Sequence, residues 1–183
     1  MTSFELYIHI MGMINGFILG LVFIMNWKKY GLIYKPETNY WWSKSHAYLP
    51  TVDFISRDIV RVYYSSRDKN SIGRIAYSEI DLKSLEVIYS TDKPIFDVGE
   101  NGTFDENGVN PSCIISKKDT KYLYYFGWQK NISGSYLLLC GLAISNDGGK
   151  TFDRFSKVPI LERRSNELYV RSAVSVIIDN GLF

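Results

Sequence analysis

The segment Pro50-Thr51-Val52, followed by Val62-Tyr63-Tyr64, returns later in the chain as Pro111-Ser112-Cys113, followed by Leu123-Tyr124-Tyr125. Both copies are rich in aromatic and β-branched residues, which favour strands. A repeat built from several short strands is typical of the blades of a β-propeller. The sequence therefore predicts an all-β fold made of similar, consecutive sheets.

The repeat extends beyond these segments. Two further pairs of segments match, Arg74-Ile75-Ala76-Tyr77-Ser78 with Gly141-Leu142-Ala143-Ile144-Ser145, and Lys93-Pro94-Ile95 with Val158-Pro159-Ile160. The tail Ser175-Val176-Ile177-Ile178 matches Ser112-Cys113-Ile114-Ile115 and predicts the opening strand of a third unit. The smallest closed propellers have about four blades. We therefore expect this chain of 183 residues to be a piece of a longer protein, truncated to about two and a half blades.

Within the first unit, residues 52–80 predict an antiparallel meander of short strands. Its turns are expected at 56–58 and 68–73. The second unit repeats this pattern, with a turn at 117–120 and a longer loop over 129–135.

The stretches 41–47 and 97–110 contain few apolar residues and join one unit to the next. In propellers such connections line the central pocket, so their polar side chains are the first candidates for function.

The segment from Ser145 to Phe152 fits the Asp-box pattern, in which Asp147 accepts backbone N–H bonds inside a hairpin turn. Gly148 supplies the positive φ that such a turn needs, and Phe152 is expected to fold over it. We interpret this box as a structural element on the outer part of a blade.

Composition limits the function classes. A hydrophobic share of 46% with 22% charged residues is ordinary for a folded chain. The net charge of +2 is small and the charges are mixed, so no nucleic-acid surface is predicted. The chain has two cysteines, Cys113 and Cys140, which we interpret as free thiols, and two histidines, so neither a metal site nor a cofactor is expected.

Residues 6–27 carry no charge and are long enough to cross a bilayer. If residues 1–25 form a membrane helix, the lysines that follow them predict that the propeller, residues 26–183, lies on the cytoplasmic side. A second interpretation is that these residues are an extension from a mis-assigned start. Both interpretations place the propeller in the cytoplasm, and the first adds a membrane as a partner.

The chain resembles the five-bladed β-propeller glycosidases, and within them an uncharacterised bacterial branch similar to glycoside hydrolase family 43. The likeness runs from about residue 26 to the end and rests on five segments: Trp27–Tyr34, Lys44–Ala47, Tyr64–Asp68, Gly102–Ser112 and the Asp-box. The resemblance implies a five-bladed β-propeller, a carbohydrate ligand and a place in bacterial polysaccharide metabolism.

In the better-known families, hydrolysis uses a pair of carboxylates, and Asp-Pro dipeptides open the inner strands. The matching dipeptides here are Leu49-Pro50 and Asn110-Pro111, so neither position supplies a base. Asp105 and Glu106 lie a few residues before the second inner strand and are the candidate catalytic residues. The alternative is that they cap their loop by accepting backbone N–H bonds.

Six polar residues are candidates for substrate binding: Lys44, His46, Arg67, Asp68, Asn107 and Arg171. His46, Asp105 and Arg171 come from three successive units and are expected to converge on one pocket. For Arg67 and Asp68, which resemble a recurrent Arg-Asp turn of the superfamily, a salt bridge with Arg74 is the alternative. Three tryptophans, Trp41, Trp42 and Trp128, could stack on sugar rings or pack inside a blade.

Two functions remain open on this evidence. The first is a glycoside hydrolase whose chemistry has moved onto Asp105 or Glu106. The second is a non-catalytic carbohydrate-binding or scaffold propeller, which the residues at Leu49 and Asn110 favour.

Overall fold

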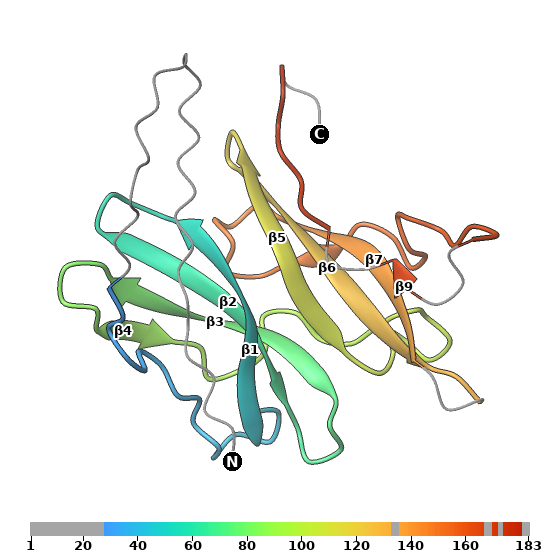
Figure 1. The fold of residues 1–183 in the computed structure, drawn as a ribbon, viewed down its shortest axis with the longest axis horizontal. Coiled ribbons are helices and arrows are strands. Elements are labelled where there is room, and N and C mark those ends of the chain that lie inside the picture. Colours follow the sequence, from blue (N-terminus) through green and yellow to red (C-terminus); the bar gives the residue numbers. More distant parts are fainter. Residues whose placement is uncertain (1–27, 133–135, 167–169, 172–173, 181–183) are drawn as a thin grey trace, which may run out of the picture.

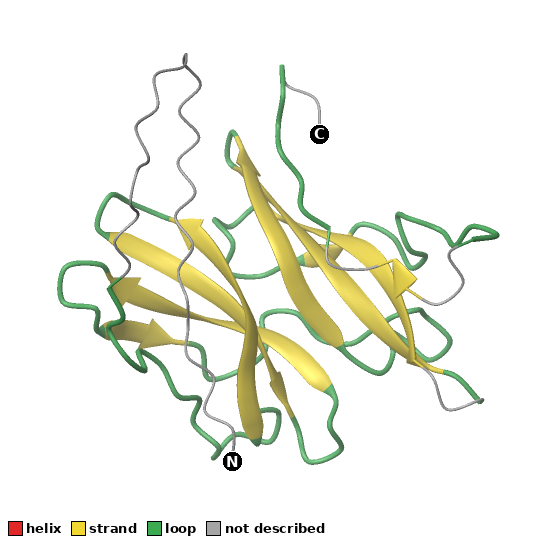
Figure 2. Cartoon of the chain, in the orientation of Figure 1, coloured by secondary structure: helices red, strands yellow, loops and turns green. Residues whose placement is uncertain are grey.

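The computed structural model describes residues 28–132, 136–166, 170–171 and 174–180. Over these ranges the chain is all-β and forms no helix, as Figure 2 shows. The N-terminal apolar run, for which we predict either a membrane helix or an extension, lies outside the described residues. Within them, no helix is long and apolar enough to cross a membrane.

The first sheet is a four-stranded antiparallel meander in the order β1-β2-β3-β4. Its strands are β1 (Ser45–Phe54), β2 (Ile59–Arg67), β3 (Gly73–Asp81) and β4 (Val87–Ser90). The meander predicted for residues 52–80 is therefore confirmed.

The second sheet repeats this arrangement in the order β5-β6-β7-β8. Its strands are β5 (Val109–Lys117), β6 (Thr120–Lys130), β7 (Tyr136–Ser145) and β8 (Asp153–Arg154). Figure 1 shows the two sheets next to each other, with β1 and β5 in contact at the centre. Two consecutive antiparallel sheets of this kind are compatible with part of a propeller.

The third unit departs from the prediction. A short strand, β9 (Val170–Arg171), pairs parallel to β7, and residues 174–178 form no strand. They lie beside β5, where Ser112 Oγ donates a hydrogen bond to the carbonyl of Val174 (2.8 Å). A strand needs its backbone groups paired in a ladder, and the contacts to β5 come from side chains, so the opening strand predicted at 175–178 is not formed.

An aromatic core fills the space between the two sheets. Because side chains alternate along a strand, Tyr63 of β2 faces this core while its neighbours Val62 and Tyr64 face the opposite side of the sheet. The burial of each side chain of this size stabilises the folded state by about 1.5–3 kcal/mol. The described core residues are Tyr63, Ile75, Tyr77, Ile95, Phe96, Phe104, Val109, Leu123, Tyr125, Leu139, Ala143 and Phe152.

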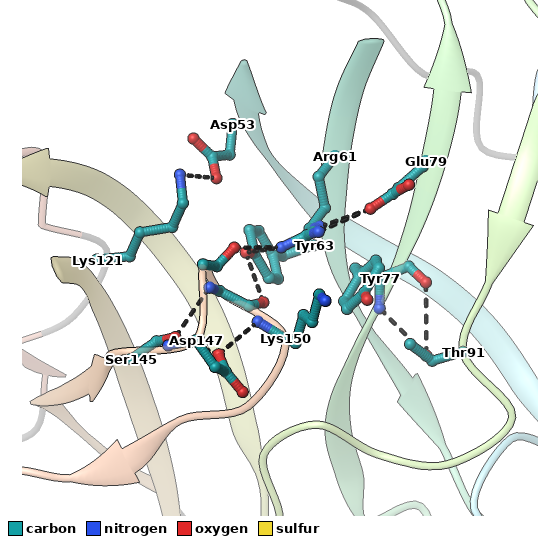
Figure 3. Close-up of polar contacts among 12 residues, drawn as sticks. Asp53, Arg61, Tyr63, Tyr77, Glu79, Thr91, Lys121, Ser145, Asp147 and Lys150 are labelled. Carbon is teal, nitrogen blue, oxygen red and sulfur yellow. Dashed lines mark hydrogen bonds and ion pairs between the residues drawn. The ribbon is translucent and has the colours of Figure 1, made fainter. Parts of the chain in front are cut away.

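At one end of this core, polar contacts join the two sheets, as Figure 3 shows. Lys121 Nζ lies 2.5 Å from the Asp53 carboxylate, and both side chains are largely buried. Arg61 Nη1 donates to the carbonyl of Gly148 (2.6 Å), and Tyr63 Oη donates to that of Gly149 (2.8 Å). We call these contacts the polar lock.

The turn that follows β7 contributes to the polar lock. Asp147 Oδ1 accepts hydrogen bonds from the amides of Lys150 (2.9 Å) and Thr151 (3.1 Å). Gly148 and Gly149 adopt φ values of 76° and 83°, and Phe152 packs edge-on against Tyr63. Gly149 also approaches the first sheet so closely that a Cβ atom there would overlap Tyr63 Oη. The turn thus contacts the neighbouring sheet, which its sequence does not reveal.

Candidate functional site

At the opposite end of the two sheets, a groove of about 140 Å³ lies between them. Here β1, β3, β5 and β7 begin, while β2 and β6 end. Among the side chains that line the groove are Tyr48, Arg67, Asn107, Trp128, Lys130 and Tyr136.

The start of β1 is irregular, and this irregularity places Tyr48. The ladder between β1 and β2 shifts register on both sides of Tyr48, which is the pattern of β-bulges. His46 and Leu49 on either side of it adopt positive φ values of 67° and 57°. Such conformations are costly for residues with a side chain and persist where the surrounding structure imposes them. The bulges re-aim the Tyr48 side chain so that it lines the groove.

A buried asparagine holds the aromatic side chains of the groove. Asn110 is fully buried, and in the amide orientation that satisfies its neighbours its Nδ2 donates to Tyr48 Oη (2.7 Å) and Ser65 Oγ (3.0 Å). Its Oδ1 accepts a hydrogen bond from Trp128 Nε1. Asn110 therefore fixes one aromatic residue from each sheet. This is the position at which the resemblance expected a catalytic Asp, and the side chain points to its neighbours inside the fold.

Two glycines let the sheets approach each other at the floor of the groove. Gly73 and Gly108 form a parallel bridge across the sheets. A Cβ atom on Gly73 would lie 2.8 Å from both Ser65 Oγ and Tyr48 Oη, closer than real Cβ contacts allow. Any side chain at this position would displace Tyr48.

Arg67 at the end of β2 supplies a positive charge to the groove. Its Nε donates to Tyr48 Oη (3.4 Å), and its guanidinium lies 5.0 Å from the centre of the Tyr48 ring. On the facing sheet, Trp128 and Tyr136 meet edge to face, with ring centres 4.9 Å apart. The groove thus combines an aromatic wall with a cation, which suits a ligand that has apolar faces and polar edges.

Asn107 is fixed within the groove by backbone contacts. Its side-chain Oδ1 accepts a hydrogen bond from the backbone N–H of Lys130 (2.8 Å). Its backbone N–H donates to the carbonyl of Trp128 (3.0 Å). Its Nδ2, which carries two N–H donors, has no hydrogen-bond partner among the described residues.

The two candidate catalytic carboxylates lie elsewhere. Asp105 is fully buried, where its Oδ2 accepts hydrogen bonds from Arg154 Nε (2.7 Å) and Tyr125 Oη (2.9 Å). Glu106 Oε2 accepts a hydrogen bond from the amide of Gly102 (2.6 Å), the loop-capping geometry that was the alternative for this pair. Neither side chain lines the groove.

Asp68 and Lys44 are held by their own loops. Asp68 accepts hydrogen bonds from the amides of Asn70 (2.7 Å) and Ile72 (3.0 Å) and pairs with Arg74 (2.8 Å). Burial alone would raise the pKa of Asp68, but the Ile72 amide and the Arg74 guanidinium outweigh it and hold the pKa below its usual value. The salt bridge with Arg74, which was the alternative for Asp68, is thus formed and is largely buried. Lys44 Nζ caps the carbonyl of Thr38 (3.1 Å).

Of the three side chains expected to converge, His46 and Asp105 do not contact each other, and the convergence with Arg171 stays a prediction. His46 is exposed and its Nδ1 contacts Ser45 Oγ (2.8 Å). Asp105 is fully buried and bonds to Tyr125 and Arg154. The backbone of Arg171 pairs with Leu139 in β9, and its side chain lies outside the described residues.

Of the three tryptophans, only Trp128 lines the groove. Trp42 is buried, with its Nε1 donating to the carbonyl of Asp92 (3.0 Å), and the exposed Trp41 lies under the Arg74 guanidinium. The sequence did not single out Tyr48, Lys130 or Tyr136. The nearest signal was the long loop at 129–135, whose two ends carry Lys130 and Tyr136.

A second, larger hollow of about 410 Å³ is mostly apolar. It lies mainly over the face of the first sheet turned away from the core, where Val62, Tyr64 and Ile80 line it. It shares Tyr48 and Trp128 with the groove. No group of three or more His, Cys, Asp or Glu side chains that could hold a metal ion occurs in the described ranges.

Comparison with known proteins adds a distant relationship. No protein-family model matches the chain. It is 34% identical over 160 residues, or 87% of its length, to Rv1502, an uncharacterised protein of Mycobacterium tuberculosis H37Rv, and equally to MT1551 of strain CDC 1551. The chain spans about half, 53%, of the length of these curated relatives.

Solved structures share the fold. A glycosyl hydrolase from Bacteroides ovatus matches with a TM-score of 0.53 and 14% identity over 69% of this chain and 35% of that one. A family 117 glycoside hydrolase from Zobellia galactanivorans matches with a TM-score of 0.53 and 20% identity over 70% and 37%. The chain therefore has a fold like that of these glycoside hydrolases, and the matches do not single out family 43.

Proposed function

We propose that this protein binds a carbohydrate in the groove between its two sheets. The observation that carries the proposal is the arrangement around Asn110, which holds Tyr48 and Trp128 from different sheets beside Arg67. Sugars present apolar ring faces and polar edges, and aromatic rings fixed next to hydrogen-bond donors match both features. The glycoside hydrolase-like fold supports a carbohydrate as the ligand.

The groove suits one sugar unit of a longer chain. Its volume is about 140 Å³. Pockets that enclose a whole drug-sized ligand are larger, with volumes from roughly 300 Å³ upward. Oligosaccharides that extend out of the groove are therefore the appropriate probes.

Binding to a panel of oligosaccharides, measured by isothermal titration calorimetry, tests the proposal. Trp128→Ala should weaken binding by at least about tenfold, corresponding to ~1.4 kcal/mol, because it removes the stacking surface. The matched control is Trp41→Ala, which removes an exposed tryptophan that does not line the groove. Equal losses in both variants, or no binding by the unmodified chain, would refute a carbohydrate site at this place.

Hydrolysis is the second candidate, and the solved structures described as glycoside hydrolases favour it. It requires two carboxylates on either side of the glycosidic bond. None of the lining residues within the described part of the chain is Asp or Glu, so binding without turnover is the primary proposal.

Assays on arabino-, xylo- and fructo-glycosides distinguish the two candidates. Turnover that disappears in Asp105→Asn and Glu106→Gln, in variants that keep the native circular dichroism spectrum, would assign catalysis to these carboxylates. Glu106→Gln is the more informative variant. Within the described residues the Glu106 carboxylate accepts a hydrogen bond from the Gly102 amide and forms no ion pair, whereas fully buried Asp105 pairs with Arg154.

We further propose that the two sheets are consecutive blades of a five-bladed β-propeller of the family 43 type. The internal repeat of the sequence and the glycoside hydrolase-like fold support this assignment. The apolar hollow on the first sheet is then the surface against which another blade packs. A structure of a full-length relative such as Rv1502 would test the blade number directly.

A further inference from the structure

We propose that the sugar held in the groove is acidic, carrying a carboxylate, sulfate or phosphate group that pairs with Arg67. This inference rests on the proposed carbohydrate site and adds the class of ligand. It starts from the charges of the groove, which contains Arg67 and Lys130 and, among its described lining residues, no carboxylate.

Arg67 differs from the other arginines that contribute to the interior of the protein. Each of those has a carboxylate partner within 2.8 Å: Glu79 for Arg61, Asp68 and Asp97 for Arg74, and Asp105 for Arg154. The described residues offer Arg67 only the hydroxyl and ring of Tyr48. A guanidinium carries five N–H donors in a planar fork, so most of its hydrogen-bonding capacity is left for a ligand.

The carboxylate next to Arg67 in the sequence does not neutralise it. Asp68 accepts hydrogen bonds from the amides of Asn70 and Ile72 and pairs with Arg74, and it is largely buried. The positive charge of Arg67 is therefore exposed to the groove rather than compensated by its neighbour.

The guanidinium also lies against a side chain that is itself anchored. Its partner Tyr48 is anchored by buried Asn110 and flanked by the two β-bulges of β1. A planar donor held on an aromatic ring loses little freedom when it binds an oxyanion in a bidentate manner. Across the groove, the Nδ2 of Asn107, which has no partner within the described ranges, and the exposed Lys130 add further donors.

Calorimetric titration of the full chain with matched ligand pairs tests the inference. One pair consists of trisaccharides of galacturonate or glucuronate and their methyl esters, which keep the ring but lose the charge. The other consists of a galactose trisaccharide with and without a sulfate or phosphate ester. We expect the charged member of at least one pair to bind at least about tenfold more tightly, with an advantage that shrinks as salt is raised. The pair that shows the difference identifies the acidic group.

Arg67→Gln should remove this advantage, so that the charged and the neutral member of the pair bind this variant with similar affinity. The control is Arg57→Gln, which makes the same charge change in the exposed turn between β1 and β2, at the other end of the sheet. Neutral and charged members that bind equally would overturn the inference while leaving the carbohydrate site intact. Absence of binding for every member would refute the carbohydrate site itself, and the inference with it.

Discussion

The two ends of the interface between the sheets differ in whether their charged side chains are paired. In the polar lock, Lys121 and Arg61 are each paired with a carboxylate, and the turn after β7 is anchored by backbone carbonyls. In the groove, Arg67 and Lys130 come from different sheets, with no carboxylate among the described lining residues. The same two sheets thus present a closed, electrically balanced end and an open, positively charged one.

The charged side chains of the polar lock stabilise the fold, whereas those of the groove are available to bind a ligand. A buried charge without a partner is costly, so charges in the lock must be paired when the protein folds. A half-buried cation that lines a groove keeps contact with water, so it needs no carboxylate partner before a ligand binds. Disrupting the lock should therefore reduce stability, whereas changes in the groove should reduce binding.

The largest expected effect follows from Lys121→Met, which keeps the length of the side chain but removes its charge. Asp53 would then be a buried carboxylate without its cation. We expect the free energy of unfolding to fall by about 3 kcal/mol. Urea denaturation followed by circular dichroism measures the change.

The double variant Asp53→Leu with Lys121→Met serves as the control. Because an apolar pair can replace a buried ion pair at little cost, it should recover most of the lost stability. A loss below about 1 kcal/mol in the single variant would show that the ion pair is hydrated and that the lock is weaker than its geometry indicates.

A smaller effect is expected from Tyr63→Phe. The change removes the hydrogen bond to Gly149 and leaves that buried carbonyl unsatisfied. The loss should cost about 1–2 kcal/mol. The matched control is Tyr136→Phe in the groove, since Tyr136 is 46% exposed and its hydroxyl has no partner among the residues described. Comparable losses in both variants would contradict the distinction between the two ends.

Asp147, in the turn after β7, should contribute to the pH dependence of the free energy of unfolding. Burial by itself would raise the pKa of this carboxyl, but hydrogen bonds from Thr151, Ser145 and the Lys150 amide hold it well below its usual value. A carboxyl whose pKa is lowered in the folded state stabilises the protein above its unfolded pKa of about 3.9, and this contribution is lost as the pH falls below it.

Urea unfolding between about pH 6 and pH 2 measures this effect. The unmodified protein should lose stability toward acid more steeply than Asp147→Asn, whose side chain does not titrate. Asp68 also has a lowered pKa and remains in both proteins, so part of the acid dependence should persist in the variant. Identical slopes would show that the Asp147 hydrogen bonds do not contribute to folding.

The sequence predicted those parts of the molecule that depend on local pattern. The antiparallel meander of residues 52–80 and its turns follow from short strands separated by polar turn residues, and both were found. The strand predicted at 175–178 is not formed, because strand formation depends on a partner ladder, which the sequence of the segment does not encode.

The same limit applies to the candidate site. Arg67 and Asn107 were selected from their loops, and the structure brings both to one groove. Lys44 and Asp68, selected in the same way, instead bond to their own loops. The buried ion pair of Asp105 depends on Arg154, which is distant in the sequence. The position of Tyr48 in the groove depends on two β-bulges, which no sequence motif predicts.

The smallest expected effect on stability is that of Arg67→Gln. Arg67 forms no ion pair within the described residues. Its replacement should therefore change the free energy of unfolding by at most about 0.5 kcal/mol. The matched variant Arg74→Gln, which leaves buried Asp68 without its cation, should cost about 3 kcal/mol. Urea denaturation of both variants measures the contrast. A loss above about 1 kcal/mol in Arg67→Gln would mean that its contact with Tyr48 supports the fold, and the retention of an unpaired arginine would then need no ligand to explain it.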